Sequence, residues 1–222
     1  MKALSHRVHS YGGSNAHPKT CVHDVAGVRR YSAGMVRIRR APINDSERIA
    51  AVHVRTWQAT YADVLPAGYL AAFDPAEWAA RRRRDLTSRR PPTEVFVAEV
   101  DGELVGHAAV RPFRTEDGTN DDDVGEVAAI YVAPEHWSTG VGLALLRVAV
   151  DHLVGHGLTE IRLWVVADNP RARRFYERFG FTADGTSRPQ PVGPGYEDVA
   201  PIEHVLYTLR RARRVEENLN HW

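Results

Sequence analysis

The chain has 222 residues, a length that fits one domain with a full hydrophobic core and room for a tail. Its 29 basic and 28 acidic residues nearly balance, which excludes a global electrostatic attraction to nucleic acid or to an anionic membrane. The single cysteine, Cys21, excludes an internal disulfide and indicates a reducing compartment, so we expect a cytoplasmic protein. The sequence contains neither a run of about 18 apolar residues nor the apolar core of a secretory signal.

The first 34 residues differ in composition from the rest of the chain. They contain Gly12-Gly13, scattered histidines and serines, and no apolar periodicity, a composition typical of disordered segments. The sequence therefore predicts a disordered extension over 1–34, a folded domain over 35–209 and a polar tail over 210–222.

Apolar periodicity predicts the elements of the folded domain. Residues 35–40 alternate as a strand, and Asn44-Asp45-Ser46 provides N-cap side chains for a helix that Leu65-Pro66 ends. A strong hairpin signal, Asp101-Gly102, joins two further strands. The remaining predicted elements are a helix over 75–88, strands over 93–100 and 103–111, a polar loop over 114–123, a strand over 126–132, a helix over 140–157, a strand over 160–166, a helix over 170–179, and strands over 181–186 and 202–209. This order predicts a mixed α/β sheet with helices on both faces.

The turn between strand 126–132 and helix 140–157 has features of an anion site. Gly140 and Gly142 have no Cβ, so a bulky anion can approach the backbone there. The N–H groups in the first turn of the following helix have no internal partners and favour a phosphate. Two glycines also occur in turns for purely structural reasons. The segment is not a Walker A loop, because no Gly-Lys-Ser/Thr follows, and it lacks the complete G-x-G-x-x-G pattern.

A second candidate site lies at the start of helix 170–179. Pro170 suits the first helical position, and Asn169 is a good cap or a free amide at the helix entrance. Tyr176 follows Asn169 by seven residues, so the two lie on one side of the helix, with the small Ala172 between them. A long ligand could follow this helix face. Tyr176 is equally compatible with simple packing in the core.

Together these segments resemble the GNAT superfamily of acyl-CoA-dependent N-acetyltransferases. The resemblance is strongest over 124–184, and the order of elements extends it to about 35–209. The motifs that carry it are Tyr131-Val132-x-Pro134, Gly140-x-Gly142, and Asn169-Pro170-x-Ala172-x-x-Phe175-Tyr176-x-x-x-Gly180-Phe181. It implies a mixed, mostly antiparallel central sheet, acetyl-CoA as co-substrate and no metal.

The resemblance also implies how the cofactor is held. The backbone of Ile130, Tyr131 and Val132 would pair with the pantetheine arm like an added strand. Asn169 would contact the pantetheine, and Tyr176 would lie near the thioester sulfur. The backbone N–H groups that would bind the pyrophosphate belong to Trp137, Ser138, Thr139, Gly140, Val141, Gly142 and Leu143. The family often has Gln or Arg where this chain has Trp137, so one polar side-chain contact is in question.

Acetyl transfer to an amine needs a base, an oxyanion donor and a route for the leaving thiolate. Glu126, at the start of its strand, is the candidate base, directly or through water; a solvated carboxylate without a role is the alternative. By resemblance, the N–H of Val132 is the oxyanion donor, and Tyr176 is the candidate general acid. Cys21 lies in the predicted extension, so we expect direct transfer in a ternary complex rather than a covalent enzyme intermediate.

Trp57 and Tyr61 share a face of the first helix and are candidates for the wall of the acceptor pocket, or for plain core packing. The acidic residues within 114–123 could attract a cationic amine, and the arginines over 81–84 and 89–90 could touch a phosphate, although a solvated surface explains both runs. His152 and His156 have a possible metal-ligand spacing without an evident third ligand.

The sequence thus predicts an N-acetyltransferase that transfers acetyl from acetyl-CoA to a primary amine of a small molecule or peptide. Membrane and nucleic-acid partners are not expected, and the resemblance makes a homodimer possible. The alternative is an acyl-CoA-binding sensor or interaction module with little catalytic activity, because of Trp137 and the uncertain base.

Overall fold

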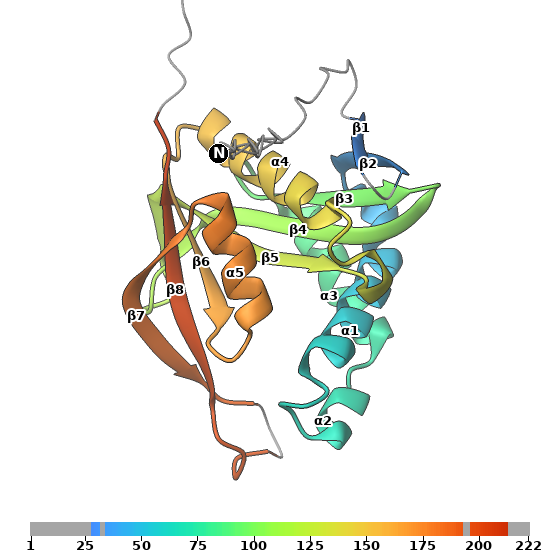
Figure 1. Ribbon diagram of the computed structural model, residues 1–222, viewed down its shortest axis with the longest axis vertical. Coiled ribbons are helices and arrows are strands. Elements are labelled where there is room, and N and C mark those ends of the chain that lie inside the picture. Colours follow the sequence, from blue (N-terminus) through green and yellow to red (C-terminus); the bar gives the residue numbers. More distant parts are fainter. Residues whose placement is uncertain (1–27, 32–33, 193–195, 213–222) are drawn as a thin grey trace, which may run out of the picture.

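The computed structural model describes residues 28–31, 34–192 and 196–212, and these form a single mixed sheet covered by helices (Figure 1). The sheet has eight strands in the order β1-β2-β3-β4-β5-β6-β8-β7 among these residues. Every neighbouring pair is antiparallel except β5 and β6. The predicted fold, a mostly antiparallel α/β sheet with helices on both faces, is confirmed.

The bounds of the elements follow the predicted pattern closely. The strands are β1 Val28–Tyr31, β2 Gly34–Arg40, β3 Glu94–Val100, β4 Glu103–Arg114, β5 Asn120–Val132, β6 Glu160–Val166, β7 Thr182–Gln190 and β8 Ile202–Arg210. The helices are α1 Ser46–Tyr61, α2 Ala67–Ala71, α3 Pro75–Ser88, α4 Val141–Gly155 and α5 Pro170–Phe179. Helices α1 and α3 cover one face of the sheet, and α4 and α5 cover the other (Figure 1). No helix among the described residues is long and apolar enough to cross a membrane.

Helices α3 and α5 begin and end where their capping residues predict. The carboxylate of Asp74 accepts from the N–H of Ala76, with Pro75 at the first helical position. At the end of α5, Gly180 adopts a left-handed conformation with φ of 111°. These local signals explain why the predicted bounds of both helices agree with the structure.

The predicted side-chain N-cap of α1 is wrong. A short 3-10 helix, Ile43–Asp45, precedes α1, and no side chain caps either element. Asp45 instead accepts hydrogen bonds from Arg39 and, at 3.4 Å, from Arg48. A charged donor outcompetes the backbone N–H for this carboxylate.

The polar loop predicted over 114–123 is also wrong, because β4 and β5 extend into it. The remaining turn is closed by Thr115, whose hydroxyl donates to the carboxylate of Asp117 and lies 2.9 Å from the carbonyl oxygen of Thr119. Pairing then continues from Arg114 with Asn120 along the ladder. Turn chemistry that satisfies its own polar groups lets both strands lengthen.

The two ends of the chain differ in how far the predictions reach. Within the segment predicted to be disordered, residues 28–31 form β1, paired with β2, a strand that the sequence did not predict. Residues 1–27, including Cys21, lie outside the described residues, as do 32–33 and 213–222. The domain boundaries at 35 and 209 stay predictions.

The main core lies between the sheet and helices α4 and α5. Leu145, Leu146 and Leu153 of α4 are fully buried and pack with Ile161 of β6 and with Phe181. A smaller core that includes Ile49, Val97 and Leu86 lies under α1 and α3. At the edge of the sheet, β7 is exposed along almost its whole length, and its pairing with β8 is irregular between Ala183 and Ser187.

Candidate cofactor and acceptor site

Strands β5 and β6 pair only at their beginnings. The parallel register joins Val124–Glu126 to Glu160–Arg162 and then stops, although both strands continue. On its other side β5 stays paired with β4 as far as Val132. The second half of β5 therefore has one edge that no described strand covers.

Register shows which backbone groups face this open edge. Val132 lies opposite Gly106, and the N–H of Ala133 donates to the carbonyl of Val105 at 2.8 Å. This is the pattern around a non-hydrogen-bonded antiparallel pair, so the N–H and C=O of Val132 point away from β4. Ile130, two residues earlier, points the same way, whereas the backbone of Tyr131 points toward β4. Of the three residues predicted to pair with pantetheine, Ile130 and Val132 have suitably directed backbones.

The carbonyl of Val132 already has two side-chain donors. Trp137 donates its indole N–H to it at 2.6 Å, and the hydroxyl of Thr56 lies 3.3 Å away. Trp137 thus fastens the turn to the end of β5, and Thr56 connects α1 to the same point. The N–H of Val132, the predicted oxyanion donor, faces the open edge.

The turn into α4 has the geometry of an anion site. Gly140 is the N-cap residue with φ of 98°, in the left-handed region, and no side chain caps the helix. The first-turn N–H groups of α4, from Val141 to Leu143, are therefore left without an intrahelical acceptor. The first turn of α4 contains no acidic residue.

Gly142 lies beside the packing between α4 and α5. A Cβ built there would meet Phe175 at 3.6 Å and Val132 at 3.8 Å, which are ordinary contact distances. That Gly142 makes room for an anion stays a prediction. The positive φ of Gly140 is the glycine feature that the turn itself requires.

Asn169 is primarily a helix cap. Its side-chain oxygen accepts from the N–H of Ala172 at 2.9 Å, which leaves the amide N–H₂ for another partner. The side chain of Asn169 also forms a hydrogen bond with Tyr61. Burial and the nearby Tyr131 raise the pKa of the Tyr61 hydroxyl, and the hydrogen bond with Asn169 partly lowers it again. Helix α1 and the start of α5 therefore meet across the site.

The two functions of Asn169 can be separated by substitution. Asn169→Ala should lose both cap and amide, and the free energy of unfolding should fall by about 1 kcal/mol. Asn169→Asp retains a capping oxygen and adds a charge that α5 tolerates at its N-terminus, but removes the amide donors. We expect Asn169→Asp to unfold at the wild-type denaturant concentration while its KM for acetyl-CoA rises. Equal stability losses in both variants would contradict this separation.

Tyr176 of α5 is 7% exposed, and its ring packs against the rings of Phe175 and Phe181. Burial, and to a smaller extent the neighbouring Tyr131 and Tyr61, raise the pKa of its hydroxyl far above the usual value. The hydroxyl therefore stays protonated at working pH and can only donate or share a proton. Packing in the core and a role as proton donor are both compatible with this position.

Glu126 is buried, with 5% exposure, so it is not the solvated carboxylate that the sequence left as an alternative. Arg111 donates to both of its oxygens, at 2.7 and 3.2 Å, and the N–H of Arg114 approaches at 3.3 Å. These contacts pair the carboxylate of Glu126 with Arg111. The residue lies where β5 and β6 separate, and its role as base stays a prediction.

The predicted acceptor-side residues line the α1 side of this region. The rings of Trp57 and Tyr61 are 4.7 Å apart, and Trp57 donates its indole N–H to the hydroxyl of Tyr131 at 3.0 Å. Both are only partly buried, and they pack against a small cluster that includes Leu65 and Leu70. The packing role that the sequence left open is thus present in the structure, and the role of the two residues in an acceptor wall stays a prediction.

Sequence reasoning missed a buried group behind this wall, which we call the imidazole cluster: His53 of α1, His107 of β4 and Arg82 of α3. His53 is 5% exposed and stacks on Trp78 at 4.1 Å, and His107 is fully buried 6.0 Å from it. No ring nitrogen of either histidine has a hydrogen-bond partner among the described residues. The signal was present, because His53 precedes Trp57 by one helical turn.

Electrostatics in the imidazole cluster disfavours additional positive charge. Burial, together with smaller contributions from the nearby Arg82 and Arg81, lowers the pKa of His53 to about 3. Burial also lowers the pKa of His107 well below its usual value, again with a contribution from Arg82. Both histidines are therefore neutral at pH 7.

The other candidate residues have structural partners. Arg83 approaches Glu47 at 3.3 Å, and the partly buried Arg82 lies 3.5 Å from Asp85. His152 and His156 each use a ring nitrogen on a backbone carbonyl, at 2.9 and 2.8 Å. The described residues contain no group of three metal-binding side chains.

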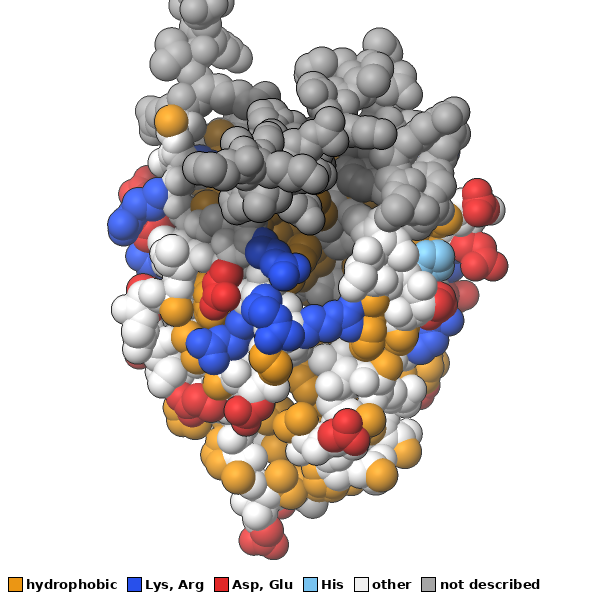
Figure 2. Space-filling model, viewed as in Figure 1, with side chains coloured by type: hydrophobic (Ala, Val, Ile, Leu, Met, Phe, Trp, Pro, Cys, Tyr) orange, Lys and Arg blue, Asp and Glu red, His pale blue; other side chains and the backbone are white. Residues whose placement is uncertain are grey.

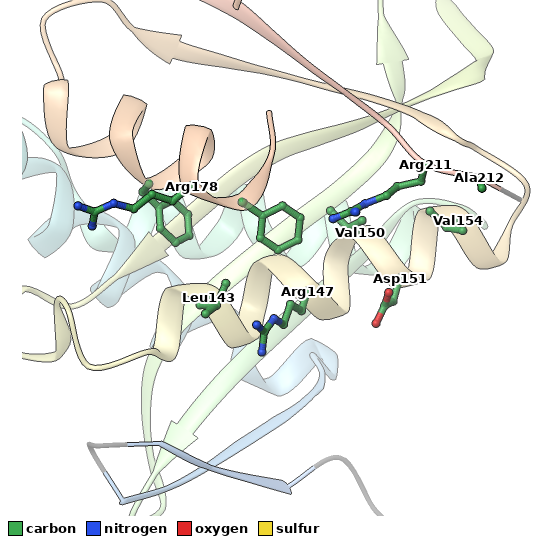
Figure 3. A pocket seen from close by; sticks show the side chains of 10 residues that line it. Leu143, Arg147, Val150, Asp151, Val154, Arg178, Arg211 and Ala212 are labelled. Atoms are coloured by element: carbon green, nitrogen blue, oxygen red, sulfur yellow. The ribbon is translucent and has the colours of Figure 1, made fainter. Parts of the chain in front are cut away.

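Positive charge gathers beside the turn. Arginine side chains cover the surface where Figure 1 places α5 (Figure 2). A groove of about 650 Å³ runs between α4 and α5 (Figure 3). Its lining includes Leu143 and Phe175, one carboxylate, Asp151, and three arginines, Arg147, Arg178 and Arg211. The anion-binding geometry of the turn therefore lies in a basic surrounding.

Comparison with known proteins agrees with this geometry. The model of the Acetyltransferase (GNAT) family matches residues 54–181. An uncharacterized N-acetyltransferase of Bacillus subtilis, YuaI, is 32% identical over 181 residues, which cover 78% of this chain and 99% of that protein. A mycothiol acetyltransferase of Streptomyces griseus is 31% identical over 187 residues, 79% of this chain, but the chain spans only 58% of that longer protein.

Among solved structures, a PaiA N-acetyltransferase from Thermoplasma acidophilum in complex with coenzyme A superposes with a TM-score of 0.60 at 20% identity. The match covers 79% of this chain and 99% of that one. At this identity the likeness concerns the fold. Sequence, fold and the separation of β5 from β6 thus lead to one conclusion: the chain belongs to the Acetyltransferase (GNAT) family.

Proposed function

We propose that this acetyltransferase transfers an acetyl group from acetyl-CoA to a primary amine, by direct attack in a ternary complex. The observation that carries the proposal is the uncovered edge of β5, which ends at Val132 beside the uncapped start of α4. An amide-containing arm fits the strand edge, and a diphosphate fits the helix start. Asn169 and Tyr176, both on the side of α5, would contact the cofactor from there.

Each of these residues would have a distinct task. Acetyl-CoA supplies the acetyl group as a thioester, whose thiol, with a pKa of about 8.5, is a fair leaving group. The N–H of Val132 would donate to the carbonyl oxygen as the amine nitrogen forms its bond to carbon. Tyr176 would donate a proton to the sulfur as the carbon–sulfur bond breaks. Glu126 would accept the proton of the amine, through water where needed.

The acceptor belongs to the α1 side in this proposal. Trp57 and Tyr61 would form its wall, and their aromatic faces suit both the carbon skeleton of an amine and its cationic form before deprotonation. Small molecules and peptides both remain acceptor classes within the proposal, and the name of the mycothiol acetyltransferases adds mycothiol-related amines to a first panel. A cytoplasmic location and a homodimer stay predictions.

Ligand-induced stabilisation tests the proposal directly. Acetyl-CoA at about 1 mM should raise the melting temperature by several degrees, since a ligand at about 100 times its Kd adds about 2.7 kcal/mol. Acetate and adenosine at the same concentration serve as controls. Release of CoA in the presence of a panel of amines then identifies the acceptor. A folded protein that neither shifts nor releases CoA would contradict the proposal.

A further inference from the structure

Trp137 and Arg171 form a stacked pair across the starts of two helices. The guanidinium carbon of Arg171 lies 3.7 Å from the centre of the Trp137 ring. Trp137 comes four residues before α4, and Arg171 is the second residue of α5. The indole cannot turn freely, because its N–H is bonded to the carbonyl of Val132. The pair therefore holds a cation in a fixed place between the two helix N-termini.

This position is unfavourable for a cation unless an anion is near. Helix N-termini carry partial positive charge, and a cation there is destabilising. Neither α4 nor α5 has an acidic residue in its first turn, and no ion pair of Arg171 occurs among the described residues. Burial lowers the pKa of Arg171 without an opposing carboxylate. Two helix ends and one guanidinium thus add their potentials, and neither first turn holds an acidic residue.

Trp137 occupies the position where the resemblance would place a polar side chain for the cofactor. Arg171 reaches the same place from the other helix and rests on that tryptophan. A guanidinium stacked on an indole keeps its N–H groups free around the edge, where they can donate to phosphate oxygens.

We propose that Arg171, positioned by Trp137, binds the diphosphate of the CoA cofactor and replaces the side-chain contact that position 137 no longer provides. The inference rests on the proposed function for the identity of the ligand. It concerns only the phosphates, so the pantetheine and acetyl portions should be recognised independently of this pair.

The test compares a CoA-based acetyl donor, which has phosphates, with an acetyl donor that has none. Arg171→Ala should raise the Kd of CoA, measured by calorimetry, about tenfold or more, the usual loss for a hydrogen bond to a charged group. The kcat/KM for S-acetylpantetheine, which has no phosphate, should stay within about twofold of the wild type. The double variant W137R/R171A should recover a large part of the CoA affinity, because the arginine at position 137, just before α4, then provides the cation for the diphosphate.

Arg188→Ala is the matched control, since Arg188 stacks on Trp164 at 4.0 Å on β7 and β6, away from the turn. It should leave the Kd of CoA unchanged. The inference is overturned if Arg171→Ala leaves the Kd of CoA unchanged, or if the variant lowers kcat/KM equally for acetyl-CoA and for S-acetylpantetheine. Calorimetry needs no turnover, so a wild-type protein that binds CoA but acetylates nothing would defeat the catalytic proposal while still testing this one.

Discussion

Replacing Tyr176 with phenylalanine should lower kcat by about 10²- to 10³-fold, within the range that a positioned proton donor contributes. The affinity for CoA should change little. The hydroxyl is buried and its pKa is raised far above the usual value, so it is fully protonated across the working pH range. The loss should therefore be a constant factor from pH 6 to pH 9, without a new titration step.

Tyr61→Phe is the control for Tyr176→Phe, because it also removes one tyrosine hydroxyl. The hydroxyl of Tyr61 lies in the same region and interacts with Asn169, but we assign it to the acceptor wall. We expect it to change the KM of the amine more than kcat. If Tyr61→Phe lowers kcat and Tyr176→Phe does not, the two tyrosines have exchanged roles. A wild-type protein with CoA affinity and no turnover to lose would favour the sensor alternative.

The second large effect is on stability in acid. Folding keeps the two imidazoles neutral, whereas the unfolded chain binds protons with an ordinary histidine pKa of about 6.5. The pKa of His53 is lowered to about 3 in the folded protein and that of His107 well below its usual value. Stability is therefore complete above pH 6.5 and is lost as the pH falls below it. At pH 5 each imidazole should cost about 2 kcal/mol.

Urea unfolding at pH 8 and pH 5 measures this loss. The wild type should lose about 4 kcal/mol from the two histidines, and His53→Phe, which keeps an aromatic ring against Trp78, should lose about half as much. His156→Gln is the control, because His156 is the C-cap residue of α4 and is exposed. Identical pH dependence in wild type and His53→Phe would show that the cluster is not responsible.

The parts of the fold that could be predicted are those with local causes. Helices α3 and α5 have their capping residues next to them in sequence, and the glycine turn and Asn169 lie within a few residues of the strands that position them. The same holds for the motifs that carry the family resemblance. Local chemistry, read along the chain, was sufficient for the fold class, and the candidate cofactor residues stay predictions.

The rest depends on contacts between segments far apart in sequence. Arg39 redirects Asp45 from its helix, and His53 becomes buried only because His107 and Trp78 pack against it from other elements. The side of Gly142 that a Cβ would occupy faces Phe175 of another helix. Periodicity cannot identify such partners, because it describes each element alone.

The irregular pairing of β7 has a consequence for the behaviour of the protein at high concentration. This outermost strand breaks its ladder between Ala183 and Ser187, has Gly185 at a φ of 91°, and contains Pro189, which has no N–H to donate. An edge with these features is a poor template for a strand from a second molecule. The outer edge formed by β7 thus resists aggregation by strand addition. The uncovered second half of β5 lies inside the sheet, away from this outer edge.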